Sequence, residues 1–173
     1  MARIDLNLEV NGKPVRVAAR PDRSLLALLR EDLGLLGTHE GCGKGDCGSC
    51  TVLLDGKPVL SCIMLAFQAD GRRVTTIEGV GEGEQLDIVQ RCFVEKGAIQ
   101  CGFCSPAMIL VARALLAEEP HPTRDRIREA ISGVLCRCTG YKKIVDAIEA
   151  ASEAASAADS QTTDGPPKAA PGR

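Results

Sequence analysis

The sequence predicts an α+β protein in two parts, with strands and one helix first and helices alone afterwards. Residues 3–10 alternate apolar and polar side chains with a period of two, which is typical of a half-buried strand. From Gln85 to Ala151 the apolar residues recur instead with helical spacing. Residues 78–84 are rich in glycine and glutamate and separate the two patterns, so we place an interdomain link there.

The first part, residues 1–78, is expected to form a small β-grasp-like domain. The Asn-Gly pair at residues 11–12 is a strong hairpin signal, and residues 14–19 are expected to form the returning strand. Ser24 can cap a helix that ends near Asp32. The remaining strands are expected at residues 50–54, 58–61 and 72–77.

The second part, residues 79–151, is expected to form four helices. Residues 107–117 are apolar nearly all round, as in a buried helix. Residues 152–173 are rich in alanine, serine and proline and lack an apolar pattern, so we expect a mobile tail or an extension along the surface. The first of the four helices is expected to carry Leu86, Val89 and Phe93 on one face and to end at Gly97, and the others are expected after the N-cap Ser105, after the N-cap Thr123 and over residues 141–151.

Composition and charge exclude several classes of function. With 173 residues, of which 45% are hydrophobic and 25% charged, the chain can bury a core. The net charge is −2 and no run of Lys and Arg occurs, so we expect no nucleic-acid or membrane-surface partner. The chain starts without a secretion signal and has no apolar stretch of about 18 residues, so we expect a cytoplasmic protein without a membrane span.

Eight of the nine cysteines fall into two sets of four. In a chain without an export signal the thiols stay reduced, so clustered cysteines indicate metal ligands and not disulfides. The ninth cysteine, Cys92, matches neither set and is expected to be a buried structural thiol. The first set is Cys42, Cys47, Cys50 and Cys62, and the second is Cys101, Cys104, Cys136 and Cys138.

The first set has the plant-type spacing of a [2Fe–2S] site, with three cysteines spaced x4 and x2 and a fourth further on. Structural zinc sites usually use two pairs of ligands, which fits this arrangement poorly. A four-thiolate cluster carries negative charge, so backbone dipoles that point at it stabilise it. Gly43, Gly45 and Gly48 allow the loop to approach the cluster closely and to direct N–H groups at sulfur.

The second set joins two short segments. Cys101 and Cys104 stand directly before a predicted helix, whose first N–H groups favour an anionic cluster. Cys136 and Cys138 lie between the third and fourth predicted helices. From the spacing alone, a [2Fe–2S] cluster and a zinc ion both remain open here, although a Cys-x-Cys segment is less usual for structural zinc.

The charged and titratable residues near the two sets have simpler explanations. Lys44 and Asp46 are expected to be solvated loop charges. A mixed His–Cys cluster would need two histidines near one set, whereas His39 and His121 are far apart in the chain. Arg137 either offsets cluster charge or points to solvent.

Three runs closely resemble the small iron–sulfur subunit of molybdenum hydroxylases, the family of xanthine dehydrogenase, aldehyde oxidoreductase, carbon monoxide dehydrogenase and N-heterocycle hydroxylases. The resemblance extends from residue 3 to about residue 151, with all eight cysteines at ligand positions. It implies a second [2Fe–2S] cluster, and not zinc, at the second cysteine set. The runs are Gly41–Cys50, Gln100–Pro106 and Leu135–Tyr141.

This resemblance also implies the architecture and the partners. The first domain would be a plant-type ferredoxin-like domain whose cluster faces FAD on a medium subunit. The second would be a four-helix [2Fe–2S]-binding domain, with its cluster near molybdopterin, in the cytosine dinucleotide form, on a large subunit. Gln100 would touch the pterin, and Cys138 would both bind iron and lie against the pterin amino group. The assembly would be a hetero-oligomer such as a dimer of heterotrimers.

The function implied is electron transfer without any catalytic residue on this chain. Electrons would leave molybdenum and pass the helical-domain cluster, then the ferredoxin-like cluster, then FAD or an external acceptor. The complex would hydroxylate an aldehyde, a purine, an N-heterocycle or a similar molecule with oxygen from water. A free-standing carrier is the first alternative, although a carrier would more often show a strongly acidic docking surface. A zinc-stabilised structural protein is the second.

Overall fold

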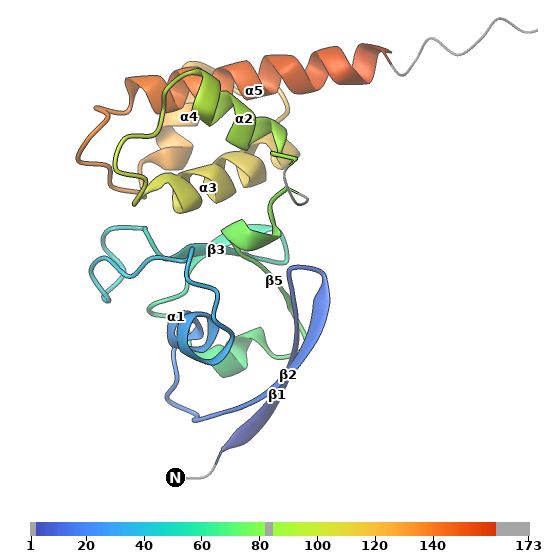
Figure 1. Ribbon diagram of the computed structural model, residues 1–173, viewed down its shortest axis with the longest axis vertical. Coiled ribbons are helices and arrows are strands. Elements are labelled where there is room, and N and C mark those ends of the chain that lie inside the picture. Colours follow the sequence, from blue (N-terminus) through green and yellow to red (C-terminus); the bar gives the residue numbers. More distant parts are fainter. Residues whose placement is uncertain (1–2, 82–84, 162–173) are drawn as a thin grey trace, which may run out of the picture.

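Strands and helices separate along the chain in the computed structural model, which describes residues 3–81 and 85–161 (Figure 1). The first part is a five-stranded mixed sheet with the strand order β2-β1-β5-β3-β4. This arrangement confirms the predicted α+β class. The strands are β1 (Ile4–Val10), β2 (Lys13–Ala19), β3 (Thr51–Leu54), β4 (Lys57–Leu60) and β5 (Arg73–Thr75).

Two tight turns set the register of the outer hairpins. Strands β1 and β2 pair antiparallel from Ile4 opposite Ala19 to Val10 opposite Lys13. The turn between them uses positive φ angles at residues 11–12, as the Asn-Gly pair predicts. A second Asp-Gly turn at residues 55–56 joins β3 to β4 in the same way. Strand β5 then pairs parallel with β1 and antiparallel with β3, which closes the sheet.

The helix between β2 and β3 covers one face of this sheet. Helix α1 (Leu25–Ala27) begins after Ser24, whose hydroxyl accepts a 3.1 Å hydrogen bond from the Ala27 N–H, as predicted for an N-cap. It continues as a π-helical turn over Leu28–Asp32. Leu25 and two further leucines of this segment are fully buried against side chains of β1, β3 and β5. Short 3₁₀ turns at Ala66–Ala69 and Ile77–Gly79 complete the first part.

Four helices form the second part, as the sequence predicts. Helix α3 is buried along most of its length and packs against β3 and β4 on one side and the other helices on the other (Figure 1). This position explains why its sequence is apolar nearly all round. The helices are α2 (Ile88–Glu95), α3 (Ser105–Glu118), α4 (Arg124–Ile131) and α5 (Lys142–Gln161).

Helix α5 corrects one expectation, because it continues to Gln161 and does not end near residue 151. Alanine is the strongest helix former, and it supplies four of the ten residues from Ser152 to Gln161. Ser152 is buried, and its hydroxyl donates a 2.6 Å hydrogen bond to the carbonyl of Pro120. Residues 152–161 of the predicted tail are therefore helical, and residues 162–173 lie outside the described part of the chain.

Each part has its own hydrophobic core. One core joins the sheet to α1, and the other joins the four helices. The helical core also contains Leu53 of β3 and Val80 of the segment after β5, so the two parts share a packed boundary.

The domain limit at residue 78 stays a prediction, and residues 82–84 of the predicted link lie outside the described residues. In the described residues, no helix is both long and apolar enough to span a membrane.

Candidate metal centres

The loop between α1 and β3 directs backbone N–H groups at the first thiol of the first cysteine set. The Sγ atom of Cys42 accepts hydrogen bonds from the N–H groups of Asp46 at 3.2 Å and Cys47 at 3.4 Å. Hydrogen bonds from the backbone of Lys44 and Cys47 lower the pKa of Cys42 to about 6. The loop therefore favours a thiolate at this position before any metal binds.

Glycines give this loop its shape. Gly43, Gly45 and Gly48 have φ angles of 66°, 90° and 72°, a region that side chains with a Cβ atom rarely adopt. Gly41 has an ordinary φ angle, but a Cβ atom there would come within 2.7 Å of the Cys47 sulfur. The positive φ angles are those that the sequence predicts for these glycines, and the backbone at Gly41 passes close to Cys47.

The β3–β4 hairpin brings the other two cysteines of the first set together. Thr51 is paired with Leu60 at the open end of the hairpin, so Cys50 and Cys62 lie just beyond the last paired residues. The hydroxyl of Ser61 donates a 2.6 Å hydrogen bond to the carbonyl of Cys50 and fixes this end. The thiols of Cys50 and Cys62 are hydrogen-bonded, and burial raises the pKa of Cys50 to about 11.

The second set is built from two segments that meet beside α3. Cys104 is buried directly before α3, and burial raises its pKa to about 12. Its thiol contacts Cys136, which follows α4. The exposed thiols of Cys101 and Cys138 form the other contact, and the hydrogen bond with Cys101 raises the pKa of Cys138.

Two residues that the sequence analysis did not single out hold the second segment in place. The Tyr141 hydroxyl accepts a 2.9 Å hydrogen bond from the Cys136 N–H, and Tyr141 itself has a φ angle of 66°. The Thr139 hydroxyl lies 3.1 Å from the Cys136 sulfur. Burial raises the pKa of Cys136, but hydrogen bonds from Thr139 outweigh this effect and bring the pKa below its usual value. Both residues belong to a conspicuous Cys-Arg-Cys-Thr-Gly-Tyr run, which was the available signal.

In both sets the thiols come in two pairs. Each iron of a [2Fe–2S] cluster takes two protein ligands, whereas structural zinc takes four ligands around one ion. The pairing fits two binuclear clusters. The pairs are Cys42 with Cys47, Cys50 with Cys62, Cys104 with Cys136, and Cys101 with Cys138.

One buried hydroxyl in the loop between α1 and β3 has no hydrogen-bond partner among the described residues. This atom is Thr38 Oγ1, and Thr38 is 2% exposed. Leaving a buried polar group without a partner costs about 1–3 kcal/mol.

The two cysteine sets are joined by direct contacts between their backbones. The Leu135 N–H donates a 2.9 Å hydrogen bond to the Cys47 carbonyl. Gly48 packs so closely on the second part that a Cβ atom there would lie 2.1 Å from the Gly133 carbonyl oxygen. One residue after Leu135 comes Cys136, so ligand candidates of both sets meet at this contact.

The remaining candidates lie as follows. Gln100 is exposed beside Cys101, and Arg137 is also exposed. Lys44 and Asp46 form a 3.0 Å ion pair in which both side chains are largely solvated. Cys92 is buried in the helical core, and burial raises its pKa, as expected for a structural thiol.

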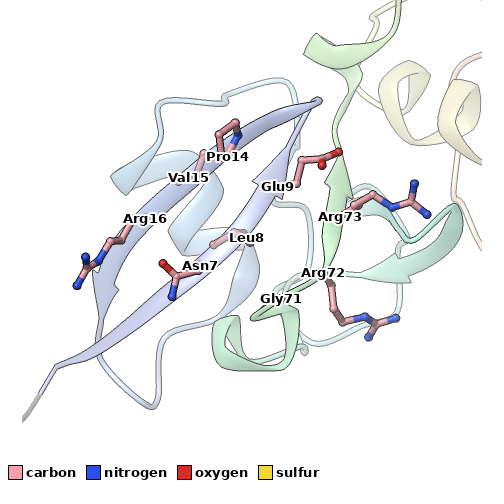
Figure 2. A pocket seen from close by; sticks show the side chains of 9 residues that line it. All are labelled: Asn7, Leu8, Glu9, Pro14, Val15, Arg16, Gly71, Arg72 and Arg73. Atoms are coloured by element: carbon pink, nitrogen blue, oxygen red, sulfur yellow. The ribbon is translucent and has the colours of Figure 1, made fainter.

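A surface hollow of about 410 Å³ lies over β1, β2 and the start of β5 (Figure 2). Its lining includes no residue of the cysteine-bearing loops. Its arginines are already paired, since Arg16 contacts Asp5 at 2.9 Å and Arg72 contacts Asp55 at 2.8 Å. The hollow is therefore not part of the candidate centres.

Two family models match the chain and together cover most of it. A "2Fe-2S iron-sulfur cluster binding domain" matches residues 8–73, and a "[2Fe-2S] binding domain" matches residues 76–149. The first range contains the whole first cysteine set, and the second contains the whole second set.

Similar proteins extend over nearly the same region. The chain is 50% identical over 153 residues to the nicotinate dehydrogenase small FeS subunit of Eubacterium barkeri, covering 88% of this chain and 98% of that protein. It is 44% identical over 147 residues to the xanthine dehydrogenase iron-sulfur-binding subunit of Escherichia coli O157:H7, covering 84% and 92%. The crystal structure of quinoline 2-oxidoreductase from Pseudomonas putida 86 superposes with a TM-score of 0.87 at 47% identity, covering 91% of this chain and 98% of that chain.

Proposed function

Because the chain belongs to the small iron–sulfur subunits of the molybdenum hydroxylase family, we propose that it conducts electrons through two [2Fe–2S] clusters within an oxidoreductase complex. The path would run from molybdopterin on a large subunit to the second cysteine set, then to the first set. From there it would lead to FAD on a medium subunit or to an external acceptor. The complex would hydroxylate an aldehyde, a purine, an N-heterocycle or a similar small molecule.

The ligands that we propose are the eight paired cysteines. Bound clusters would supply one-electron redox chemistry, and the chain's own residues bind and shield them. The backbone N–H groups at Cys42 stabilise negative charge on sulfur, which favours the reduced state of the centre. The thiols of Cys50 and Cys104 have raised pKa values in the metal-free chain and must release their protons to bind iron.

The hydrogen bond from Leu135 to Cys47 is the observation that carries this proposal. The Leu135 nitrogen lies 2.9 Å from the carbonyl oxygen of Cys47, and Leu135 is bonded directly to Cys136. A single hydrogen bond and a few covalent bonds thus connect ligand candidates of the two sets. Electron transfer between centres falls steeply with separation, so a short packed connection is what a relay requires.

The surface around the second set supports a docked partner. Cys101, Cys138 and Gln100 are exposed there. Three large apolar side chains nearby are also exposed, namely Ile99 at 40%, Phe103 at 45% and Leu135 at 56%. Exposed apolar side chains around a polar site are typical of an interface. We propose that the large subunit covers this face, with Gln100 and Cys138 against the pterin, in its cytosine dinucleotide form.

The test begins with the composition of the native assembly. We expect about four iron and four sulfide per chain, since two [2Fe–2S] centres are proposed. We also expect a large molybdenum-containing subunit to purify with the chain. A colourless protein that holds zinc and no sulfide would contradict the proposal, and an iron–sulfur chain without such a subunit would favour the free-standing carrier.

Substitutions then assign the centres. EPR spectra of the reduced protein should show two distinct signals, of which Cys42→Ser removes or alters one and Cys104→Ser the other. Cys92→Ser is the matched control, because Cys92 is a buried cysteine outside both sets, and it should leave both signals intact. If Cys42→Ser and Cys104→Ser abolish the same signal, the assignment of separate centres is wrong.

A further inference from the structure

The imidazole of His39 reaches from the first cysteine loop to the loop of the second set. Its Nδ1 atom lies 2.8 Å from the carbonyl oxygen of Phe103. A carbonyl oxygen only accepts hydrogen bonds, so Nδ1 carries the proton and donates it. The His39 and Phe103 rings also stack, with centroids 4.7 Å apart and an interplanar angle of 14°. Phe103 stands between Cys101 and Cys104 in the sequence.

The second cysteine set has two segments, and the first loop holds each of them by a separate contact. The segment of Cys136 and Cys138 is held through the hydrogen bond between Leu135 and Cys47. The segment of Cys101 and Cys104 is held through the contact of His39 with Phe103. The two contacts together fix both halves of the second site relative to the first.

We infer that His39 is a positioning residue, which sets the placement of the second centre relative to the first and so the rate of electron transfer between them. This inference rests on the proposed function, because it requires both centres. Phe103 is 45% exposed in this chain, and the stacked imidazole covers one face of its ring. The hydrogen bond fixes the backbone at the same point. Side-chain stacking and backbone anchoring thus act on one short segment between two ligand candidates.

The hydrogen bond and the ring stacking between His39 and Phe103 can be removed separately in the full-length chain within its native assembly. His39→Phe keeps an aromatic ring and removes the donor, whereas Phe103→Ala keeps the carbonyl acceptor and removes the stacking. His39→Ala removes both contacts. The chain's other histidine gives a matched control, His121→Ala, because His121 contacts Ser156 on α5 at 3.3 Å and lies outside both cysteine loops.

The measurement is the magnetic coupling between the two reduced centres, read from the splitting and broadening of their EPR signals. This coupling depends steeply on the distance between the centres. Loss of one hydrogen bond should increase the population of displaced arrangements about fivefold. We therefore expect His39→Ala to weaken and spread the coupling and to slow electron transfer between the centres, with smaller changes in His39→Phe and Phe103→Ala.

The outcomes separate this inference from the proposed function. If the unmodified assembly shows no iron, sulfide or paired signals, the proposed function fails. If it shows two coupled centres, and the coupling and transfer rate in His39→Ala match those of His121→Ala, His39 has no positioning role. If His39→Ala lowers the iron content, the comparison is made with His39→Phe and Phe103→Ala, which each keep one contact. Unchanged coupling in both of these variants also overturns the inference.

Discussion

The two cysteine sites differ in how far their parts are separated along the chain. The first site takes three of its four cysteines from one loop, residues 42–50, and the fourth from the neighbouring hairpin. The second site joins Cys104, at the start of α3, to Cys136, beyond the end of α4. A local site depends on the backbone shape of one loop, whereas a divided site depends on the packing of the helices that carry its segments.

The largest expected effect would break the divided site. Phe93 is fully buried in the helical core, which also contains Cys104. Phe93→Ala should cost about 3–5 kcal/mol in the free energy of unfolding, because it leaves a cavity. The EPR signal of the second centre should be lost before that of the first in a denaturant titration. Leu28→Ala in the sheet core should reverse this order, and simultaneous loss in both variants would show that the two parts unfold together.

A second substitution tests the contact between the sites. Gly48→Ala must accept a left-handed φ angle and displace the Gly133 carbonyl, so we expect a loss of about 3 kcal/mol in unfolding free energy. Gly56→Ala is the control, because Gly56 has a φ angle of 83° and no neighbour within 4 Å of an added Cβ atom. It should lose only about 1–2 kcal/mol. Equal losses in urea unfolding would mean that the close packing at Gly48 has no energetic weight.

A smaller effect is expected at the extension of α5. Ser152→Ala removes the hydrogen bond to Pro120 and should cost about 1 kcal/mol. The expected loss is confined to stability, and both EPR signals should stay unchanged. Thermal unfolding followed by circular dichroism measures it. An altered signal of either centre would show that this helix end influences the clusters.

The smallest effect concerns the metal-free chain and its pH dependence. The pKa of Cys42 is lowered to about 6, below its ordinary value, so its contribution to stability is present at alkaline pH and is lost as the pH falls through 6. The pKa of Cys104 is raised to about 12, so its contribution is present at neutral pH and is lost as the pH rises toward 12. Iodoacetamide should therefore modify Cys42 at neutral pH and more slowly below pH 6, while Cys104 stays protected. Peptide mass spectrometry reads both rates, and equal labelling would contradict the pKa difference.

The sequence predicts most of the first site because its information is local. One loop contains both the x4 and x2 spacing and the glycines with positive φ angles, Gly43, Gly45 and Gly48. The order of its cysteines and glycines in the sequence therefore suggests its shape. The four helices are likewise predicted by periodicity. The end of helix α5 was predicted too early, because the apolar periodicity fades after Ala151. Helix propensity continues beyond that residue, and the hydrogen bond from Ser152 to Pro120 holds the helix in place.

The contacts between the two parts could not be predicted from spacing. His39 and Phe103 are 64 residues apart, and the pairing of Leu135 with Cys47 depends on how α4 is packed. These contacts involve an ordinary histidine and a backbone carbonyl, which have no pattern of their own in the sequence. The motif residues therefore identify the candidate ligands, and the tertiary structure determines how the sites are connected.

The β3–β4 hairpin acts as a spacer whose length sets one half of the first site. Its last paired residues, Thr51 and Leu60, place Cys50 and Cys62 just past the end, and β4 is the edge strand of the sheet. Lengthening each strand by two residues would carry that pair of cysteines about 7 Å outward on the same face, since strands rise roughly 3.4 Å per residue. Lengthening each by one would also turn both side chains to the opposite face. The position of these two cysteines therefore fixes the number of paired residues in the β3–β4 hairpin.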